Sequence, residues 1–119
     1  MDDFKLILLV RKDLRMSPGK QCAQCSHASI GIYKETQKKH LWTKWRKTWE
    51  NNQKCVVLSV NDVIEMDEIQ AEAIAKNIPT FTVIDAGLTE VPPNSKTVVA
   101  LGPAPHNILH PLINKLKLL

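Results

Sequence analysis

The chain has 119 residues, of which 44% are apolar and 24% charged, and a formal net charge of +4 at pH 7. These values predict one folded domain over residues 1–119 and exclude a disordered chain, and no apolar run reaches the roughly 18 residues that a membrane span needs. Three cysteines at irregular spacing do not form a disulfide framework, so we expect free thiols and a cytoplasmic location.

The charged residues are unevenly distributed along the chain. Positive charge concentrates between residues 34 and 54, and an acidic run follows between residues 62 and 72. One basic and one acidic side suit a protein that presents a preferred face to a polyanion. The same asymmetry is common in proteins that bind no polyanion, so the charge pattern leaves both possibilities open.

A strand and a long helix are predicted first. Phe4–Val10 is a nearly continuous apolar run, typical of a strand covered on both faces. The turn residues at 17–19 then lead into a helix that continues to about Lys39. At about 100° per residue, one stripe of this helix, about 80° wide, carries five residues: Lys20, Gln24, His27, Gly31 and Lys34. The stripe is either a functional face or a solvated polar face, and the helix alone favours the second.

Thr43–Trp49 is predicted to form a second helix, because Trp42, Trp45 and Trp49 repeat at the spacing of one helical face. Tryptophans among lysines can stack on nucleic-acid bases. A tryptophan stripe is more often part of a core, and we expect packing here.

The second half of the chain alternates between strands and helices. Three runs have the composition of strands: Cys55–Val60, Thr80–Ile84 and Thr97–Leu101. The helix between the first two is expected to bury one apolar side, made of Ile64, Ile69, Ala73 and Ile74. Gly102-Pro103 is expected to stop the fourth strand, and a last helix is expected from Asn107 to Lys117.

The element order is therefore β-α-α-β-α-β-β-α. This order predicts an α/β domain with three layers, in which helices flank a four-stranded sheet. The link between the third and fourth strands has no crossover helix, so we expect a mixed sheet with at least one antiparallel pair.

Cys22-Ala-Gln-Cys25, followed closely by His27, resembles a redox or metal-binding motif. The chain has no second Cys/His pair at ligand spacing, and the two cysteines and His27 lie on opposite sides of the predicted helix. We therefore expect buried thiols and no metal site.

Asp85-Ala-Gly-Leu-Thr89 follows the third predicted strand. Crevices at the carboxyl ends of strands are where α/β sheets bind ligands, and Ser95 and Thr97 add hydroxyl groups. An Asx turn with satisfied hydroxyl groups explains the local sequence equally well. No nucleophile elbow, Walker loop or dinucleotide fingerprint occurs.

Together, these two stretches resemble the type 2 peptidyl-tRNA hydrolase family of archaea and eukaryotes. The matching segments cover almost the whole chain: Val10–Met16, Gly19–Ala28, Gly31, Tyr33–Lys34, Lys54, Asp85–Thr89, Pro93–Val98 and Gly102–Pro103. Two features depart from the family pattern, namely Cys22, where alanine is usual, and the tryptophan-rich basic stretch 42–49. Neither touches the polar stripe.

The resemblance implies hydrolysis of the ester that joins a peptide to the 3′ ribose of tRNA, which returns the tRNA to translation. It also implies a mixed four-stranded α/β fold, a homodimer, peptidyl-tRNA as partner, and neither an organic cofactor nor a metal. By position, the implied site residues are Lys20, His27, Asp85 and Thr89 for catalysis, and Gln24, Lys34, Lys54, Ser95 and Thr97 for contacts with substrate or tRNA.

Ester hydrolysis needs a positioned water, a proton acceptor and a stabilised oxyanion. Asp85 or His27 can orient or deprotonate the water, Lys20 can stabilise the oxyanion or hold a phosphate, and Thr89 can donate a hydrogen bond. Two alternatives stay open: a non-catalytic RNA- or protein-binding adaptor on the same fold, and a thiol or metal protein built on Cys22 and Cys25.

Overall fold

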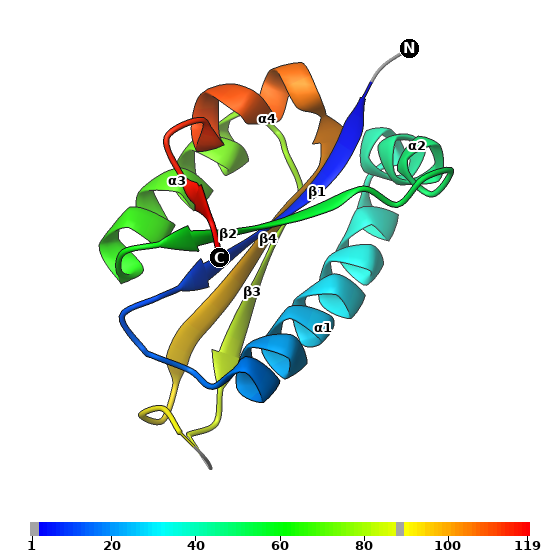
Figure 1. Cartoon of the computed structure of the whole chain (residues 1–119). Coiled ribbons are helices and arrows are strands. Elements are labelled where there is room, and N and C mark those ends of the chain that lie inside the picture. Colours follow the sequence, from blue (N-terminus) through cyan, green and yellow to red (C-terminus); the bar gives the residue numbers. More distant parts are fainter. Residues whose placement is uncertain (1–2, 88–89) are drawn as a thin grey trace.

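The computed structural model of the chain describes residues 3–87 and 90–119 (Figure 1). In chain order its elements are β1 (Phe4–Arg11), α1 (Pro18–Glu35), a 3-10 helix η1 (Thr36–Lys38), α2 (His40–Trp49), β2 (Cys55–Val60), α3 (Val63–Ala75), β3 (Thr80–Asp85), β4 (Ser95–Pro105), α4 (His106–Ile113) and β5 (Lys117–Leu118). Among these helices, none combines the length and the apolar character that crossing a membrane requires.

The strands form one mixed sheet in the order β3-β4-β1-β2-β5. β1 and β2 run parallel, whereas the β3–β4, β4–β1 and β2–β5 pairs are antiparallel. The predicted mixed sheet and its antiparallel β3–β4 pair are therefore confirmed. The predicted count of four strands is wrong, because a short fifth strand, β5, pairs with β2.

The predicted ends of the last two elements are also wrong. β4 continues past Leu101 to Pro105 because it keeps pairing with β1, across a register shift that Gly102 accommodates at a φ of 102°. α4 ends at Ile113, two residues after the proline at position 111, instead of running on to Lys117. Lys117, the last residue of the predicted helix, instead forms β5 together with Leu118.

Helices cover both faces of the sheet, which gives the predicted three layers (Figure 1). β1 lies in the middle and is buried on both faces, as its apolar run predicts. Ile7 and Leu9 face a core that includes residues of α3 and α4. The side chains that alternate with them, Leu6, Leu8 and Val10, face a second core under α1.

The first two helices differ from their predicted bounds by a few residues. α1 ends at Glu35, and η1 tightens the chain before α2 begins at His40. The tryptophans of α2 are half-buried, as the packing interpretation expects. Trp45 packs on the core beneath α3 and α4, and Trp49 packs on the core beneath α1.

α3 buries only part of the side that was predicted. Met66 and Ala73 are buried and Ile69 packs beside them, so the core-facing positions follow an i, i+3, i+7 spacing. Ile64 and Ile74 lie outside this line and are 66% and 61% exposed. The prediction was wrong for these two residues because the helix is apolar on more than one side, so its pattern does not single out one face.

Candidate active site

The first turn of α1 is tied to the segment that precedes β4. Ser17 caps the helix, with its Oγ accepting a hydrogen bond from the Lys20 N–H at 3.3 Å. The Ser17 N–H and hydroxyl both donate to the carboxylate of Glu90, at 3.0 and 2.7 Å. These bonds hold the helix start, and with it Lys20, close to the chain that follows β3.

Lys20 forms an ion pair with Asp85. Its Nζ lies 2.6 Å from Oδ1 of Asp85, which is the last residue of β3. The two side chains are only 12% and 9% exposed. Because water screens such a pair poorly, the attraction is stronger than in an ion pair on the open surface. This contact joins the two stretches that the sequence singles out.

The other carboxylate oxygen of Asp85 is also occupied. Oδ2 accepts a hydrogen bond from the Gly87 N–H at 2.7 Å. Gly87 has a φ of 76°, and a Cβ there would overlap the backbone of Pro93, so this turn requires glycine. The hydrogen bond from Lys20, and after it the one from Gly87, lower the pKa of Asp85 below its usual 3.8. Asp85 is thus a fixed, ionised carboxylate at neutral pH.

One turn further along α1, Gln24 contacts β4. The Thr97 hydroxyl donates to Oε1 of Gln24 at 2.5 Å, and both side chains are buried. Within residues 3–87 and 90–119, the Nε2 of Gln24 makes no hydrogen bond, and it is not a fully buried atom. The amide is therefore oriented by Thr97 and keeps a free donor next to the Lys20–Asp85 pair.

His27 and Gly31 continue the same side of α1 and face Phe81 of β3. The rings of His27 and Phe81 have centroids 6.5 Å apart. A Cβ on Gly31 would overlap the Phe81 ring, so the missing side chain admits this residue of the sheet. The imidazole of His27 is exposed and supported from beneath, which suits a group that meets a ligand from solution.

The structure places the remaining predicted residues in different environments. Ser95 is the β4 partner of Asp85 in the strand register, and its hydroxyl donates to the Pro92 carbonyl at 2.7 Å. Lys34 is exposed near the far end of α1, and Lys54 precedes β2 with its Nζ 3.4 Å from Asp3. Both lysines therefore lie apart from the cluster around Asp85. Thr89 falls outside the residues that the structure describes, so its role stays a prediction.

Sequence reasoning missed two contributors, Glu90 and Phe81. Phe81 had a usable signal, because side chains at alternate positions of a strand share a face and Phe81 is four residues before Asp85. Glu90 had none, since its partner Ser17 is 73 residues away in the sequence.

The cysteines lie outside this cluster. Cys25 is half-buried against the core under α1, and burial raises the pKa of its thiol to about 11. Cys22 is exposed, so the expectation of buried thiols was wrong for it. The core-facing line of α1 contains Gln24, Ala28 and Ile32, so it borders the polar stripe instead of lying opposite to it. Over the described parts of the chain, no three His, Cys, Asp or Glu side chains converge as metal ligands.

The cluster therefore combines a fixed ammonium–carboxylate pair, a free amide donor and an exposed imidazole on one side of α1. An ammonium and an amide can stabilise developing negative charge, and an imidazole can accept a proton from water. Such a set fits hydrolysis of an activated carbonyl compound by water.

Comparisons with known proteins agree with this chemistry. The family model described as "Peptidyl-tRNA hydrolase PTH2" matches residues 4–119. A "Peptidyl-tRNA hydrolase" of Pyrobaculum aerophilum is 37% identical over 117 residues, which cover 98% of each chain. "Peptidyl-tRNA hydrolase 2, mitochondrial" of Homo sapiens is 36% identical over 117 residues, covering 98% of this chain and 64% of that protein.

The fold is also found in a solved structure of a protein of unknown function from an Agrobacterium strain, C58. The two structures superpose with a TM-score of 0.66 at 15% identity, covering 100% of this chain and 99% of the other. At this identity the likeness concerns the fold alone.

Proposed function

This chain belongs to the peptidyl-tRNA hydrolase PTH2 family, and on that premise we propose that it hydrolyses the ester between peptide and tRNA at the Lys20–Asp85 pair. The observation that carries the proposal is the 2.6 Å contact between these two side chains at a poorly solvated point between α1 and β3. The product is free tRNA, available again for translation.

The hydrogen bonds of Asp85 favour a division of roles. A carboxylate with a lowered pKa, whose two oxygens already accept hydrogen bonds, is a weak proton acceptor. Asp85 therefore acts by holding the ammonium of Lys20 in place, and Lys20 stabilises the oxyanion that forms on the ester carbonyl. His27, which is exposed on the same side of α1, takes the proton of the attacking water and returns it to the ribose 3′ oxygen as the ester bond breaks. The free amide of Gln24 orients the substrate.

Three further features belong to this proposal. Lys34 and Lys54, away from the reacting groups, contact phosphates of the tRNA. Two exposed leucines, Leu118 of β5 and Leu119 after it, lie beside Cys22 and Val57 and provide a surface for a homodimer. The three free thiols fit the reducing cytoplasm. Light scattering of the purified chain tests the homodimer, and cell fractionation tests the cytoplasmic location.

The central experiment is release of N-acetyl-amino acid from N-acetyl-aminoacyl-tRNA. We expect the wild type to release it and Asp85→Asn to lower kcat/KM by about 10²- to 10⁴-fold, the usual range for a general acid–base or charged catalytic group. Asp67→Asn is the matched control, because Asp67 also pairs with a lysine, Lys96. Asp67 belongs to α3, away from the Lys20–Asp85 pair, and its side chain is 56% exposed. A wild type without activity, or equal rates for the two variants, would contradict the proposal and favour an adaptor.

A further inference from the structure

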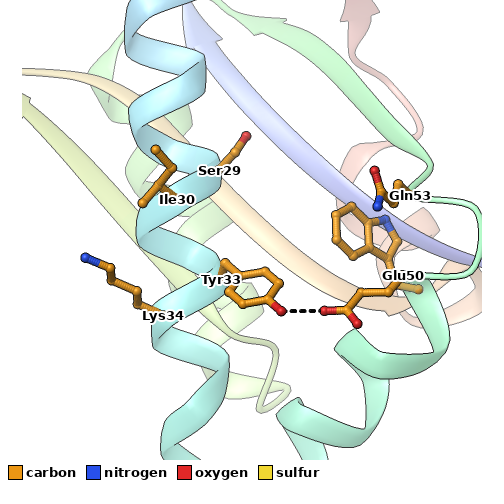
Figure 2. A pocket seen from close by; sticks show the side chains of 7 residues that line it. Ser29, Ile30, Tyr33, Lys34, Glu50 and Gln53 are labelled. Carbon is orange, nitrogen blue, oxygen red and sulfur yellow. Dashed lines mark hydrogen bonds between the residues drawn. The ribbon is translucent and has the colours of Figure 1, made fainter.

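A groove runs between α1 and the end of α2, on the side of α1 away from β3. Its walls include Tyr33 and Lys34 from α1 and Trp49, Glu50 and Gln53 from the end of α2 and the segment after it. Figure 2 shows the Tyr33 hydroxyl reaching across the groove to Glu50, while Lys34 extends on the outer side of the helix. None of these residues takes part in the Lys20–Asp85 cluster.

Both aromatic rings are held in position. The Tyr33 hydroxyl donates to Glu50 Oε1 at 2.6 Å, and the Trp49 indole N–H donates to the Lys54 carbonyl at 2.8 Å. Tyr33 nevertheless stays 41% exposed. Fixed and accessible rings lose little conformational entropy when a planar ligand stacks on them.

The groove deepens into a cavity of about 210 Å³ that shares Tyr33 and Trp49 with it. The inner walls are mostly apolar and include Leu6, Ile32 and Pro103. A dry cavity of about 150 Å³ already holds a benzene ring, so this one has room for a planar heteroaromatic group.

The polar wall of the cavity is the guanidinium of Arg46, which is only 8% exposed. It lies 4.4 Å from the centre of the Tyr33 ring and donates from Nη1 to the Thr36 hydroxyl at 3.3 Å. Its Nε lies 3.3 Å from a Glu50 oxygen but without hydrogen-bond geometry, so within the described residues this buried donor has no acceptor. The guanidinium thus gives one wall of the otherwise mostly apolar cavity a positive charge.

The stretch of chain that contributes Lys34 and the α2 side of the groove is basic. Between residues 34 and 54 the acidic residues are Glu35 and Glu50, and each is paired with a cation. The same stretch contains six exposed lysines: Lys34, Lys38, Lys39, Lys44, Lys47 and Lys54. This charge attracts a polyanion.

We propose that the groove and its cavity bind an unpaired nucleobase of the substrate tRNA. The base stacks on Tyr33 and Trp49 beside the guanidinium of Arg46, and lysines of the stretch 34–54 contact the phosphates. The base must be unpaired, because a base inside a helix is already stacked on its neighbours. The inference rests on the proposed function, since it takes the ligand to be the tRNA.

The site is remote from the reacting ester. Tyr33 is thirteen residues from Lys20 on the same helix, which is about 20 Å at 1.5 Å per residue. A base held there contributes to binding of the tRNA without touching the ester. Variants of the groove should therefore change Kd and KM and leave kcat unchanged.

Ser29→Leu is the first test, because Ser29 lines both the groove and the cavity and a leucine would fill them. Its control is Ser26→Leu, the same change one turn earlier at an exposed position of α1. We expect Ser29→Leu to raise the Kd for deacylated tRNA, measured by fluorescence anisotropy, by about 10-fold, the loss of one base stack. KM for N-acetyl-aminoacyl-tRNA rises equally, and Ser26→Leu behaves as the wild type.

A second pair of variants separates stacking from packing. Tyr33→Phe keeps the ring and should keep the wild-type Kd to within about twofold, whereas Tyr33→Leu should weaken tRNA binding about as much as Ser29→Leu. Circular dichroism and thermal unfolding establish that each variant is folded. Folded Ser29→Leu and Tyr33→Leu proteins with the wild-type Kd would overturn the inference.

Mononucleotides distinguish the tRNA from a free nucleotide as the source of the base. If AMP, GMP, CMP and UMP displace tRNA only at millimolar concentration, the result supports the tRNA as the source of the bound base. Micromolar binding of one mononucleotide that Ser29→Leu abolishes, with an unchanged Kd for tRNA, overturns that assignment. A wild type that binds tRNA through this groove but releases no peptide would refute the proposed function and leave the groove as an RNA site.

Discussion

The ammonium of Lys20 lies 2.6 Å from the carboxylate of Asp85, although 65 residues separate them in the chain. Each group supplies the opposite charge that the other needs in a place with little water. Removal of one partner therefore does more than delete a contact, because it leaves the other charge poorly compensated.

Lys20→Met should move the acid limb of the curve of unfolding free energy against pH. The hydrogen bond from Lys20 is the first cause of the lowered pKa of Asp85, so the pKa should rise when Lys20 is lost. In the wild type, the low folded-state pKa gives stability that is complete above the unfolded value of about 3.9 and is lost as the pH falls through the folded pKa. In Lys20→Met this loss starts at a higher pH, and kcat/KM falls by at least about 100-fold.

Unfolding and kcat/KM measured across acidic and neutral pH check this prediction. Lys96→Met is the control, because Lys96 pairs with Asp67, which is far more exposed than Asp85. An acid limb that stays at the same pH in Lys20→Met would show that Lys20 does not control the ionisation of Asp85.

Thr97→Val should destabilise the fold, because it leaves the buried Oε1 of Gln24 without its donor. We expect a loss of about 1–3 kcal/mol in the free energy of unfolding. The double variant Thr97→Val/Gln24→Met removes both polar partners and should recover most of it. Ser95→Ala, which removes a hydroxyl bonded only to the Pro92 carbonyl, should lose less than about 1 kcal/mol. Chemical denaturation measures all four proteins.

Activity separates the two roles of Gln24 in the same set of variants. The double variant should be stable and yet slow, because it lacks the free amide donor beside Lys20. Wild-type kcat/KM in a stable double variant would show that Gln24 only packs.

Sequence patterns were sufficient for the elements whose burial is unambiguous. The strand Phe4–Arg11 is apolar at nearly every position and was found with an error of one residue. The stripe of α1 and the end of β3 were both identified as candidate sites. Their contact depends on the strand order, which puts β3 at the sheet edge beside β4 and beneath α1. No local sequence pattern encodes this strand order. Only the resemblance to a known family joined the two stretches into one predicted site.

The failures have local causes. β5 is two residues long, too short for a period of two to appear, and it forms only because β2 offers a free edge. α3 has apolar residues on several sides, so its buried side is set by the sheet and not by its own pattern. The bond between Ser17 and Glu90 joins residues that no spacing rule connects.

Gly31→Ala should destabilise the protein even though alanine is the better helix former. Its Cβ would overlap the ring of Phe81, and overpacking costs about 1–3 kcal/mol, against a gain of about 1 kcal/mol in helix propensity. Displacement of Phe81 should also move His27, whose ring it supports, and lower kcat. Thermal unfolding and kinetics of the variant measure both effects.

Two comparisons test the cause. Gly19→Ala is the matched control on the same helix, since within residues 3–87 and 90–119 a Cβ there meets no other part of the fold within 4 Å, and it should not destabilise the protein. Gly31→Ala/Phe81→Leu should regain part of the lost stability, because leucine frees the space of the ring. Equal stability losses for the double and single variants would refute the steric explanation.

Lys34→Ala and Lys54→Ala should weaken tRNA binding and flatten its dependence on salt. A lysine that contacts a phosphate contributes about 0.7–0.9 to the slope of log K against log salt concentration, because the contact releases a counterion from the RNA. Lys34 has no ion-pair partner among residues 3–87 and 90–119. The Nζ of Lys54 lies 3.4 Å from Asp3, so Lys54 must give up this ion pair to bind a phosphate. We therefore expect the larger loss of affinity for Lys34→Ala.

Lys76→Ala, at an exposed position after α3 on the opposite layer of the fold, is the control and should keep the wild-type slope. The measurement is the Kd of deacylated tRNA over a series of salt concentrations, and slopes equal to that of the wild type in both variants would remove Lys34 and Lys54 from the tRNA-binding surface.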